Sequence, residues 1–600
     1  MSKLLVSSSC VVTDHFKGRI VESGFLESTF KQSNGLFLTS FKKLKVDNVN
    51  YYEKDDSFVA IAGTLIYKEK IGKDSLEMLL SDFCQHQDIN ALRKETIGNY
   101  MCVVKNGNTL TAFCDSRNIF ELYYFKKESI WALSNSLLEM AESLGGECIT
   151  VNESALLEEM YSRCIWGDET VFNEIKRLSG DEYITINLAN GEVKLIENPN
   201  YGSCVDQSFN EAVTSFSDGL SKICSVVKKV YGTLSIAMTG GMDSRSVLAG
   251  LLSQSSSNSS LESLNTTHLT LLYGIGNSQL IETKNADKRI IDDIAERFSL
   301  PKAYLNWSTP EPINQAWPEL ASKYGFLGRV YSGSSYMHNS LESRDDEFIA
   351  YGYFGESYSF EDTLLSGQFK LDDFLNYYIG NKIKSISKDY KKYRNHISNK
   401  IEATLKKYKI NPNKISINDW ILLELEMRRK KDTVMVRLSN QHRYSFAILG
   451  EESLLRYAYC PISFKKNRKF LLNMIKINCP VLLDIPIYSH GEERTLDYKR
   501  MELTTPFIMR VRDIMKKYLK ITKLRQIALR ISKRVLDDKK SVSEINKIDD
   551  MEDSIKSIYS NLSYKPHDIF AVASTNLSLE ARYVYTAMLL QKFNKNLKAK

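Results

Sequence analysis

One segment of this 600-residue chain constrains its fold more than any other. Residues 233–252 read TLSIAMTGGMDSRSVLAGLL, so an apolar run typical of a strand leads through a polar glycine pair into a helical pattern. The main-chain N–H groups at the start of such a helix, together with the helix dipole, favour an anion. The segment therefore predicts a strand, an anion-binding loop and a helix.

The residues of this loop suit the phosphates of a nucleotide. Gly240 and Gly241 allow the backbone to close around phosphate oxygens, and the hydroxyls of Thr239 and Ser244 can add hydrogen bonds. Asp243 can hold the Mg²⁺ that accompanies a triphosphate. No GxxxxGK[ST] pattern occurs here, so the loop is not a Walker loop. The alternative is a glycine turn with a capping Asp or Ser, but the flanking strand and helix favour the anion site.

The rest of the chain predicts several domains, since its length exceeds what one core usually supports. Residues 1–197 carry short apolar runs separated by turn residues, which indicates a strand-rich domain with one helix at residues 75–84. Residues 198–210 are polar, contain Pro and Gly, and are the predicted linker. After it, helices at 211–231, 245–252 and 287–298 alternate with strands at 233–238, 268–273 and 302–307. This alternation predicts a parallel sheet covered by helices.

Beyond residue 361 the sequence reads mainly as helices. It ends in a Lys/Arg-rich stretch at 510–540 and a last helix at 578–593. In the helix at 287–298, the apolar side chains of Ile290, Ile291, Ile294, Ala295 and Phe298 fall on one face, as a helix lying on a sheet requires.

Composition excludes several classes of function. A formal charge of +7, from 80 basic and 73 acidic residues, is too small to indicate a nucleic-acid partner. Ten cysteines without a CxxC pair or a Cys/His cluster predict neither a zinc site nor a disulfide framework. No apolar stretch approaches the roughly 20 residues that span a bilayer, and no signal peptide is evident. We expect a cytoplasmic protein with no nucleic-acid partner and no transmembrane segment, and a homodimer remains open.

The TGGMDSR sequence resembles the SGGxDS pyrophosphate loop of the asparagine synthetase family, which includes β-lactam synthetases and lasso-peptide cyclases. Further segments resemble family motifs in the same order. Asp287 with IIDDIAERFSLP is similar to an Asp-containing helix, YGYFGESY (351–358) to GDGGDE, and QHRYSFAIL (441–449) to ExRxPFLD. In the N-terminal part, IAGTLIY, IGNYMCVV, CDSRNIFELYYF and WALSNSLLEMA resemble landmarks of the glutaminase domain. The likeness covers residues 4 to about 496.

The resemblance implies an α/β and α+β multidomain protein. Residues 1–197 would form an Ntn-hydrolase-like αββα sandwich, and residues 211–500 a parallel-sheet α/β ATP-pyrophosphatase (PP-loop) domain, followed by a helical extension at 501–600. ATP and Mg²⁺ would be the cofactors. In this family a carboxylate is activated as an acyl-adenylate, which an amine then attacks.

The resemblance also implies site residues. Asp243 and Glu356 would bind the metal and, with Arg494, form the catalytic set. Arg494 is included because the family's catalytic lysine is missing, with no Lys from residue 480 until Lys499. The expected nucleotide-binding residues are Thr239, Gly240, Gly241, Met242, Asp243, Ser244, Arg245, Leu272, Asp287, Gly352 and Gly355. Two alternatives stay open: Glu356 as a surface residue of a loop, and Arg245 as a partner in a salt bridge on the helix surface.

Glutamine hydrolysis is not expected. The family nucleophile is a cysteine exposed by removal of the initiator methionine, whereas residue 2 here is Ser, and Cys10 reads as a strand cysteine. Lys43 stands where the family has its glutamine-binding arginine, and Lys lacks the bidentate fork that a carboxylate needs. Ala62 precedes Gly63 where the family has an oxyanion-hole Asn.

The leading hypothesis is therefore an ATP-dependent ligase that forms amide bonds in a biosynthetic tailoring pathway, without using glutamine. Its partners would be the carboxylate and amine of a small-molecule or peptide substrate, or free ammonia. The alternative is a nucleotide-binding regulator or scaffold that has lost catalysis, favoured by the missing lysine and by Tyr353 in place of a family carboxylate. An RNA-modifying enzyme with the same loop type is disfavoured by the glutaminase-like half and the composition.

Overall fold

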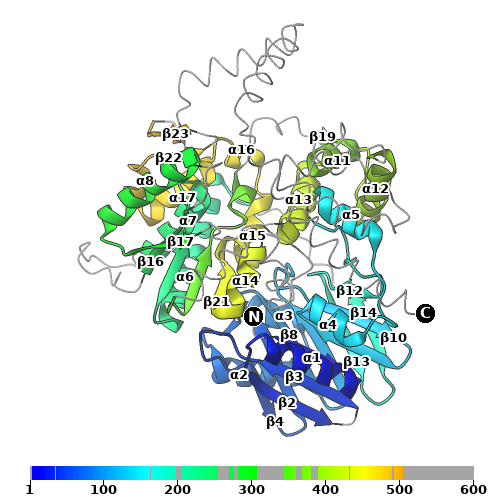
Figure 1. The fold of residues 1–600 in the computed structure, drawn as a ribbon. Coiled ribbons are helices and arrows are strands. Elements are labelled where there is room, and N and C mark those ends of the chain that lie inside the picture. The colour runs from blue at the N-terminus through cyan, green and yellow to red at the C-terminus, as the bar shows by residue number, and fades with distance from the viewer. Residues whose placement is uncertain are drawn as a thin grey trace, which may run out of the picture.

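Figure 1 shows the computed structural model of the chain, in which the N-terminal sheets form one body and a parallel sheet with its helices forms another. The structure describes residues 3–503, except for 34, 163, 198–205, 254–268, 276–280, 307–343, 360–367, 380–389, 432, 490–491 and 500. The predicted helices at 510–540 and 578–593, most of the extension at 501–600, and most of the predicted linker lie outside these residues.

Two six-stranded antiparallel sheets form the N-terminal body. The first has the order β12 (Ile175–Arg177), β10 (Tyr123–Lys127), β11 (Ile130–Ser134), β1 (Leu4–Ser7), β3 (Leu36–Phe41), β2 (Glu27–Ser33). The second has the order β14 (Glu192–Glu197), β13 (Glu182–Asn187), β9 (Thr109–Cys114), β8 (Tyr100–Asn106), β5 (Ser57–Gly63), β4 (Tyr51–Lys54). A short two-stranded ladder joins β6 (Ile66–Tyr67) to β7 (Thr96–Ile97).

The two sheets lie face to face between two layers of helices. Alternate side chains of both sheets, such as Leu4 and Leu38 from the first and Ala60 and Val103 from the second, share one buried core. The outer face of the first sheet packs on α1 (Cys10–Glu22) and α4 (Leu137–Leu144). The outer face of the second sheet packs on α2 (Gly72–His86) and α3 (Ile89–Lys94). The order helix, sheet, sheet, helix agrees with the αββα prediction.

The sequence interpretation of Cys10 was wrong, and so was the expectation of a single helix in this body. Cys10 begins α1 rather than a strand, because the side chain of Ser9 caps the helix by accepting the Val12 N–H at 3.4 Å. Val12, Phe16 and Ile20 then form the buried face of α1. Helices α3, α4 and α5 (Glu153–Ser162) were missed as well.

A five-stranded parallel sheet is the centre of the second body. Its order is β17 (Lys302–Asn306), β16 (Leu269–Ile275), β15 (Leu234–Ala237), β18 (Phe348–Tyr351), β21 (Tyr444–Ala447), and all four ladders are parallel. Helices α6 (Phe209–Val230), α7 (Met242–Leu252) and α17 (Lys469–Asn478) pack together, while α8 (Ile281–Phe298) lies against β16. The predicted alternation of strands and helices is confirmed.

Helix α6 begins inside the predicted linker. Ser208 and Glu211 form a capping box at its start, with the Glu211 N–H donating to Ser208 Oγ and the Ser208 N–H to the Glu211 carboxylate. The five apolar residues predicted to face the sheet from α8 are all buried in the common core.

A further group of helices has a hydrophobic core of its own. It comprises α11 (Leu371–Ile379), α12 (Tyr390–Lys407) and α13 (Ile417–Lys431), and α5 of the N-terminal part lies against α11 and α12 (Figure 1). Helix α14 (Val434–His442) then leads into β21. The short elements also include β19 (Gln368–Phe369), β20 (Ile415–Ser416), α15 (Glu452–Leu455), α16 (Ile462–Lys465), β24 (Leu496–Asp497) and β25 (Glu502–Leu503).

Over the ranges that the structure describes, every helix is too short or too polar to cross a bilayer. The nine cysteines within these ranges are free thiols.

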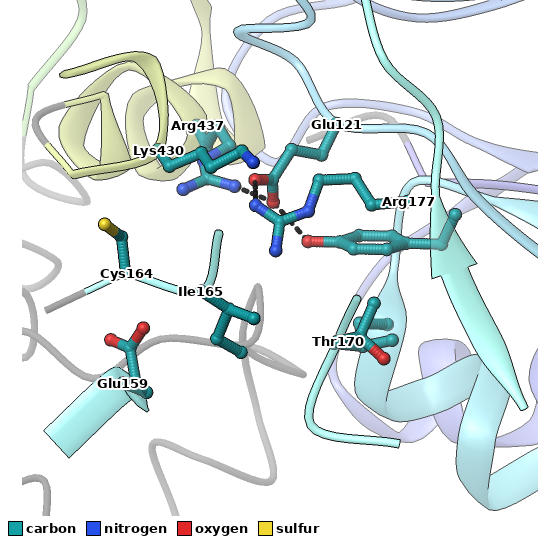
Figure 2. A pocket seen from close by; sticks show the side chains of 10 residues that line it. Glu121, Glu159, Cys164, Ile165, Thr170, Arg177, Lys430 and Arg437 are labelled. Atoms are coloured by element: carbon teal, nitrogen blue, oxygen red, sulfur yellow. Dashed lines mark hydrogen bonds and ion pairs between the residues drawn. The ribbon is translucent and has the colours of Figure 1, made fainter. Parts of the chain in front are cut away.

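A buried cluster of charges joins the two bodies (Figure 2). Glu121, just before β10, accepts from Arg177 Nη1 at 2.7 Å, from the guanidinium of Arg437 in α14 and from the hydroxyl of Tyr123. Burial alone would raise the pKa of Glu121, but Arg177 and Arg437 hold it at about 2. The carboxylate therefore stays charged and ties α14 to the first sheet.

Replacing Glu121 with alanine tests this contact. The change leaves two buried guanidinium groups without their carboxylate, so we expect Glu121→Ala to lower the free energy of unfolding by about 3–5 kcal/mol. Denaturant unfolding followed by circular dichroism measures it. Glu192→Ala is the matched control, because it removes a half-exposed carboxylate paired with Lys194 on the surface, and it should change stability by less than about 0.5 kcal/mol. Equal losses of stability in Glu121→Ala and Glu192→Ala would contradict the stabilising role of the buried cluster.

Candidate functional site

The glycine loop, residues 239–244, lies at the carboxyl end of β15 and runs into α7. Gly240 is held on two sides, since its N–H donates to Asp287 Oδ1 at 2.7 Å and its carbonyl accepts from the Tyr488 N–H at 2.9 Å. A Cβ at position 240 would lie 2.9 Å from both Asp287 Oδ1 and Tyr488 Cβ. Only glycine fits this place, and the Asp287 side chain supports the loop by binding the backbone N–H of Gly240.

The two hydroxyls of the loop fold it onto itself. The Thr239 N–H donates to Ser244 Oγ at 3.1 Å, and the Gly241 N–H reaches Thr239 Oγ1 at 3.3 Å. Met242 is buried in the core, so only its backbone can face a ligand. The N-cap of α7 is Gly241, which has no side chain to cap the first turn. The N-terminal dipole of α7 thus remains suited to an anion.

A second segment, the turn at residues 352–356, closes over the start of α7. It follows β18, the parallel neighbour of β15, and enters the short helix η4 (Gly355–Tyr358). A Cβ at Gly352 would lie 2.6 Å from Ser244 N, and one at Gly355 only 2.2 Å from Asp243 Cγ. Both glycines are therefore required for contact between the two segments. Through this contact, the structure brings Glu356 beside Asp243.

Phe354 fixes the shape of this turn. Its φ of 75° is in the left-handed region, which costs a non-glycine residue about 1–3 kcal/mol. The Phe354 ring is buried and packs so closely on Gly450 that a Cβ there would lie 2.8 Å from it. The buried ring thus holds the turn in a strained conformation, as is common where a chain presents functional groups.

The carboxylates of Asp243 and Glu356 act on each other. Burial, with the charge of Glu356 as a second cause, raises the pKa of Asp243 to about 7, although Arg468 and Arg428 oppose the shift. Two neighbouring carboxylates with this mutual repulsion suit a divalent cation. Within the described residues, no group of three or more His, Cys, Asp or Glu side chains could hold a metal. Mg²⁺ fits here because it commonly takes one or two carboxylates and completes its shell with phosphate oxygens and water.

The two arginines near Asp243 were missed in the sequence. Arg428 belongs to α13, and its Nη1 lies 3.4 Å from Glu356 Oε1. Arg468 precedes α17 and is its N-cap residue. The only sequence signal was the helical spacing between Glu424 and Arg428, which is typical of an ordinary surface pair. Their place beside Asp243 depends on the tertiary fold.

Arg494 lies on a hairpin next to the loop. It belongs to β23 (Glu492–Arg494), which pairs with β22 (Ile487–Ser489) so that Arg494 is opposite Ile487. Tyr488, the next residue of β22, donates its N–H to Gly240. The fold thus brings the strand of Arg494 to the glycine loop, whereas the arginines whose charges act on Asp243 are Arg468 and Arg428.

Arg245 has a different role from both sequence interpretations. It is buried, and its guanidinium donates to the carbonyls of Leu482 at 3.0 Å, Ile485 at 2.6 Å and Pro486 at 2.7 Å. Arg245 therefore positions the segment that leads into β22, instead of forming a surface salt bridge or reaching over the loop. Burial lowers its pKa to about 9.

Leu272 supports the loop from the neighbouring strand. Its carbonyl accepts the Met238 N–H at 2.7 Å, and its side chain is in the core. Leu272, one of the expected nucleotide-binding residues, thus supports the start of the loop through its carbonyl.

Neither a protein-family model nor a curated protein matches this chain. Among solved structures, it is similar to glutamine phosphoribosylpyrophosphate amidotransferase from B. subtilis, complexed with ADP and GMP, at 7% identity and a TM-score of 0.25, over 51% of this chain and 91% of that one. A structure described as the allosteric regulatory enzyme of purine biosynthesis matches at 7% identity and a TM-score of 0.24, over 57% and 93%. NMN synthetase from Francisella tularensis matches at 14% identity and a TM-score of 0.16, over 26% and 58%. At such TM-scores none of them decides the fold or function of this chain.

The raised pKa of Asp243 predicts a pH-dependent cost to stability. Between its ordinary value of 3.8 and about 7, the folded protein holds a proton that the unfolded chain has released, so stability falls as the pH rises through this range. Asn cannot ionise and avoids the cost. We expect Asp243→Asn to stabilise the metal-free protein by roughly 2–3 kcal/mol more at pH 8 than at pH 5, because about two pH units of this range lie between them.

Urea unfolding at the two pH values measures this difference. Asp345→Asn is the matched control, because it removes an exposed carboxylate near the opposite, amino end of β18, and it should show no such dependence. An equal effect of Asp243→Asn at both pH values would contradict the electrostatic account of the site.

Proposed function

We propose that the protein is an ATP-dependent, AMP-forming ligase that joins a substrate carboxylate to an amine or to ammonia. The observation that carries this proposal is the contact between the glycine loop and the turn at 352–356, which sets Asp243 and Glu356 side by side at the N-terminus of α7. A glycine-lined loop, a helix dipole and two carboxylates suit a triphosphate with its Mg²⁺. The order of family-like motifs agrees with this chemistry.

In the proposed reaction, a carboxylate oxygen of the substrate attacks the α-phosphorus of ATP and the bond to the β-phosphate breaks. Pyrophosphate leaves, and an amine then attacks the acyl carbon and releases AMP. Bound Mg²⁺ would neutralise charge on the leaving pyrophosphate. Asp243 and Glu356 would hold that ion, and the N–H groups at the start of α7 would orient the phosphates. Arg428 and Arg468 would add positive charge where the family lysine is absent.

The proposed nitrogen source is ammonia or an amine of the substrate, not glutamine. Lys43 is buried, and its Nζ donates to Asn440 O at 3.0 Å, Asn440 Oδ1 at 3.1 Å and Arg443 O at 3.3 Å. Burial lowers its pKa well below the ordinary value. A side chain with three acceptors from the second body is poorly placed to take the carboxylate of glutamine. The substrates would be small molecules or peptides.

A second candidate is a nucleotide-binding regulator or scaffold without catalysis. The observation that favours it is the absence of lysine from residues 480–494. This segment contacts the glycine loop through the Tyr488 N–H, so a lysine there would lie near the phosphates. A ligase needs a positioned cation at the leaving pyrophosphate. The two candidates therefore differ in whether the bound nucleotide is cleaved.

Product analysis separates them. The full-length protein is incubated with Mg-ATP and a pool of small carboxylates and peptides, with and without ammonium, and AMP and pyrophosphate are quantified. A ligase should form both in equal amounts, and Asp243→Asn should reduce the rate by at least about 100-fold, because it removes a carboxylate from the metal. Asp345→Asn, far from the loop, should retain the activity.

Formation of ADP, or an activity that persists in Asp243→Asn, would contradict the ligase. ATP binding without any cleavage across the pool would favour the regulator.

A further inference from the structure

Contacts with neighbouring side chains fix the position of Arg428. Its Nε and Nη2 donate to Glu424 Oε1 at 2.9 and 2.7 Å, and Glu424 Oε1 also accepts from the Tyr377 hydroxyl at 3.1 Å. Glu424 is buried, and the side chain of Arg428 is only 16% exposed. These contacts fix one edge of the guanidinium and direct Nη1 to Glu356, at 3.4 Å.

The carboxylate of Glu356, the other partner of this ion pair, is much more exposed than Arg428. The side chain of Glu356 is 50% exposed, whereas the Gly355 backbone before it is fixed against Asp243. Glu356 can therefore rotate while its position in the chain stays constant. The ion pair between Arg428 and Glu356, with 3.4 Å between the charged atoms, is longer and therefore weaker than an optimal charged hydrogen bond. The pair can thus open without loss of the contacts that hold Arg428.

The position of Arg428 also matches a need of the reaction. Its charge acts on Asp243 at the start of α7, where a triphosphate would lie. A guanidinium is always charged and binds phosphate oxygens in a planar, directed way. Arg428 therefore carries a fixed positive charge at the place where the leaving pyrophosphate gains negative charge.

We propose that Arg428 pairs with Glu356 only until a metal ion binds this carboxylate, and that Arg428 then binds pyrophosphate. In the metal-free protein Arg428 holds Glu356 by their ion pair. With Mg²⁺ and a triphosphate bound, Glu356 would serve as a ligand of the ion, and Nη1 of Arg428 would donate to an oxygen of the pyrophosphate group. This role rests on the proposed function, since it concerns the same site, and it names the cation that replaces the missing lysine.

The two functions of Arg428 have opposite effects on binding, which gives a sharp test. Arg428 competes with a metal for Glu356 but attracts pyrophosphate. In Arg428→Gln, Mn²⁺ alone should bind several-fold more tightly than in the wild type. Pyrophosphate in the presence of saturating Mn²⁺ should bind about tenfold more weakly, corresponding to one charged contact. An arginine that only stabilises α13 would shift both affinities in the same direction or leave both unchanged.

Both affinities are measured on the full-length protein, with Mn²⁺ as the probe by electron paramagnetic resonance of the free ion and pyrophosphate by titration calorimetry. Arg428→Lys guards against a folding defect, because it retains the charge. It should bind pyrophosphate with an affinity between those of the wild type and Arg428→Gln. Arg394→Gln is the matched control, since Arg394 pairs with Asp372 between α12 and α11, and it should change neither affinity.

Two results would overturn the role of Arg428. One is a change of both affinities in the same direction in Arg428→Gln, and the other is no change in either; the proposed ligase would survive both. A wild-type protein that binds neither Mn²⁺ nor pyrophosphate would instead overturn the proposed function and this role with it.

Discussion

The site depends on one close contact between two loops that follow neighbouring parallel strands, β15 and β18. Because β15 and β18 run in the same direction, their carboxyl ends meet at one edge of the sheet and their loops must share the same space. Gly352 and Gly355 make this possible, as any side chain there would enter the backbone of Ser244 or the carboxylate of Asp243. The contact sets two carboxylates beside each other, and their repulsion creates the demand for a cation.

The N-terminal body supports β21, the strand at one side of the parallel sheet, and α14, the helix that leads into it. Helix α14 is fixed to this body by Arg437, which binds Glu121, and by Asn440, whose Oδ1 accepts from Thr64 Oγ1 at 2.6 Å. Thr64 in turn accepts the Ser445 N–H of β21 at 2.8 Å. Strand β21 pairs with β18, which ends at the turn carrying Glu356. The N-terminal body can thus contribute to the site by holding the strand beside it.

Local patterns were sufficient to predict much of this arrangement. The strand, glycine loop and helix at 233–252 carry their own hydrophobic period and turn residues, so their structure follows from short-range rules. The motif order placed Gly352, Gly355 and Glu356 near the loop. Cys10 was misassigned because the capping role of Ser9 competes with a strand-like apolar run. Arg428 and Arg468 could not be found, since only tertiary packing brings α13 and the start of α17 to Asp243. For the same reason the burial of Arg245 among three carbonyls has no signature in the sequence.

The most direct test of the account is a crystal structure of the full-length protein with Mg²⁺ and α,β-methylene ATP, in which the bond that a ligase would break cannot be cleaved. The account predicts that the triphosphate lies along residues 239–244 at the N-terminus of α7, with a Mg²⁺ ion bound by Asp243 and Glu356. A nucleotide bound elsewhere on the chain, or a metal ion that avoids these two carboxylates, would contradict it.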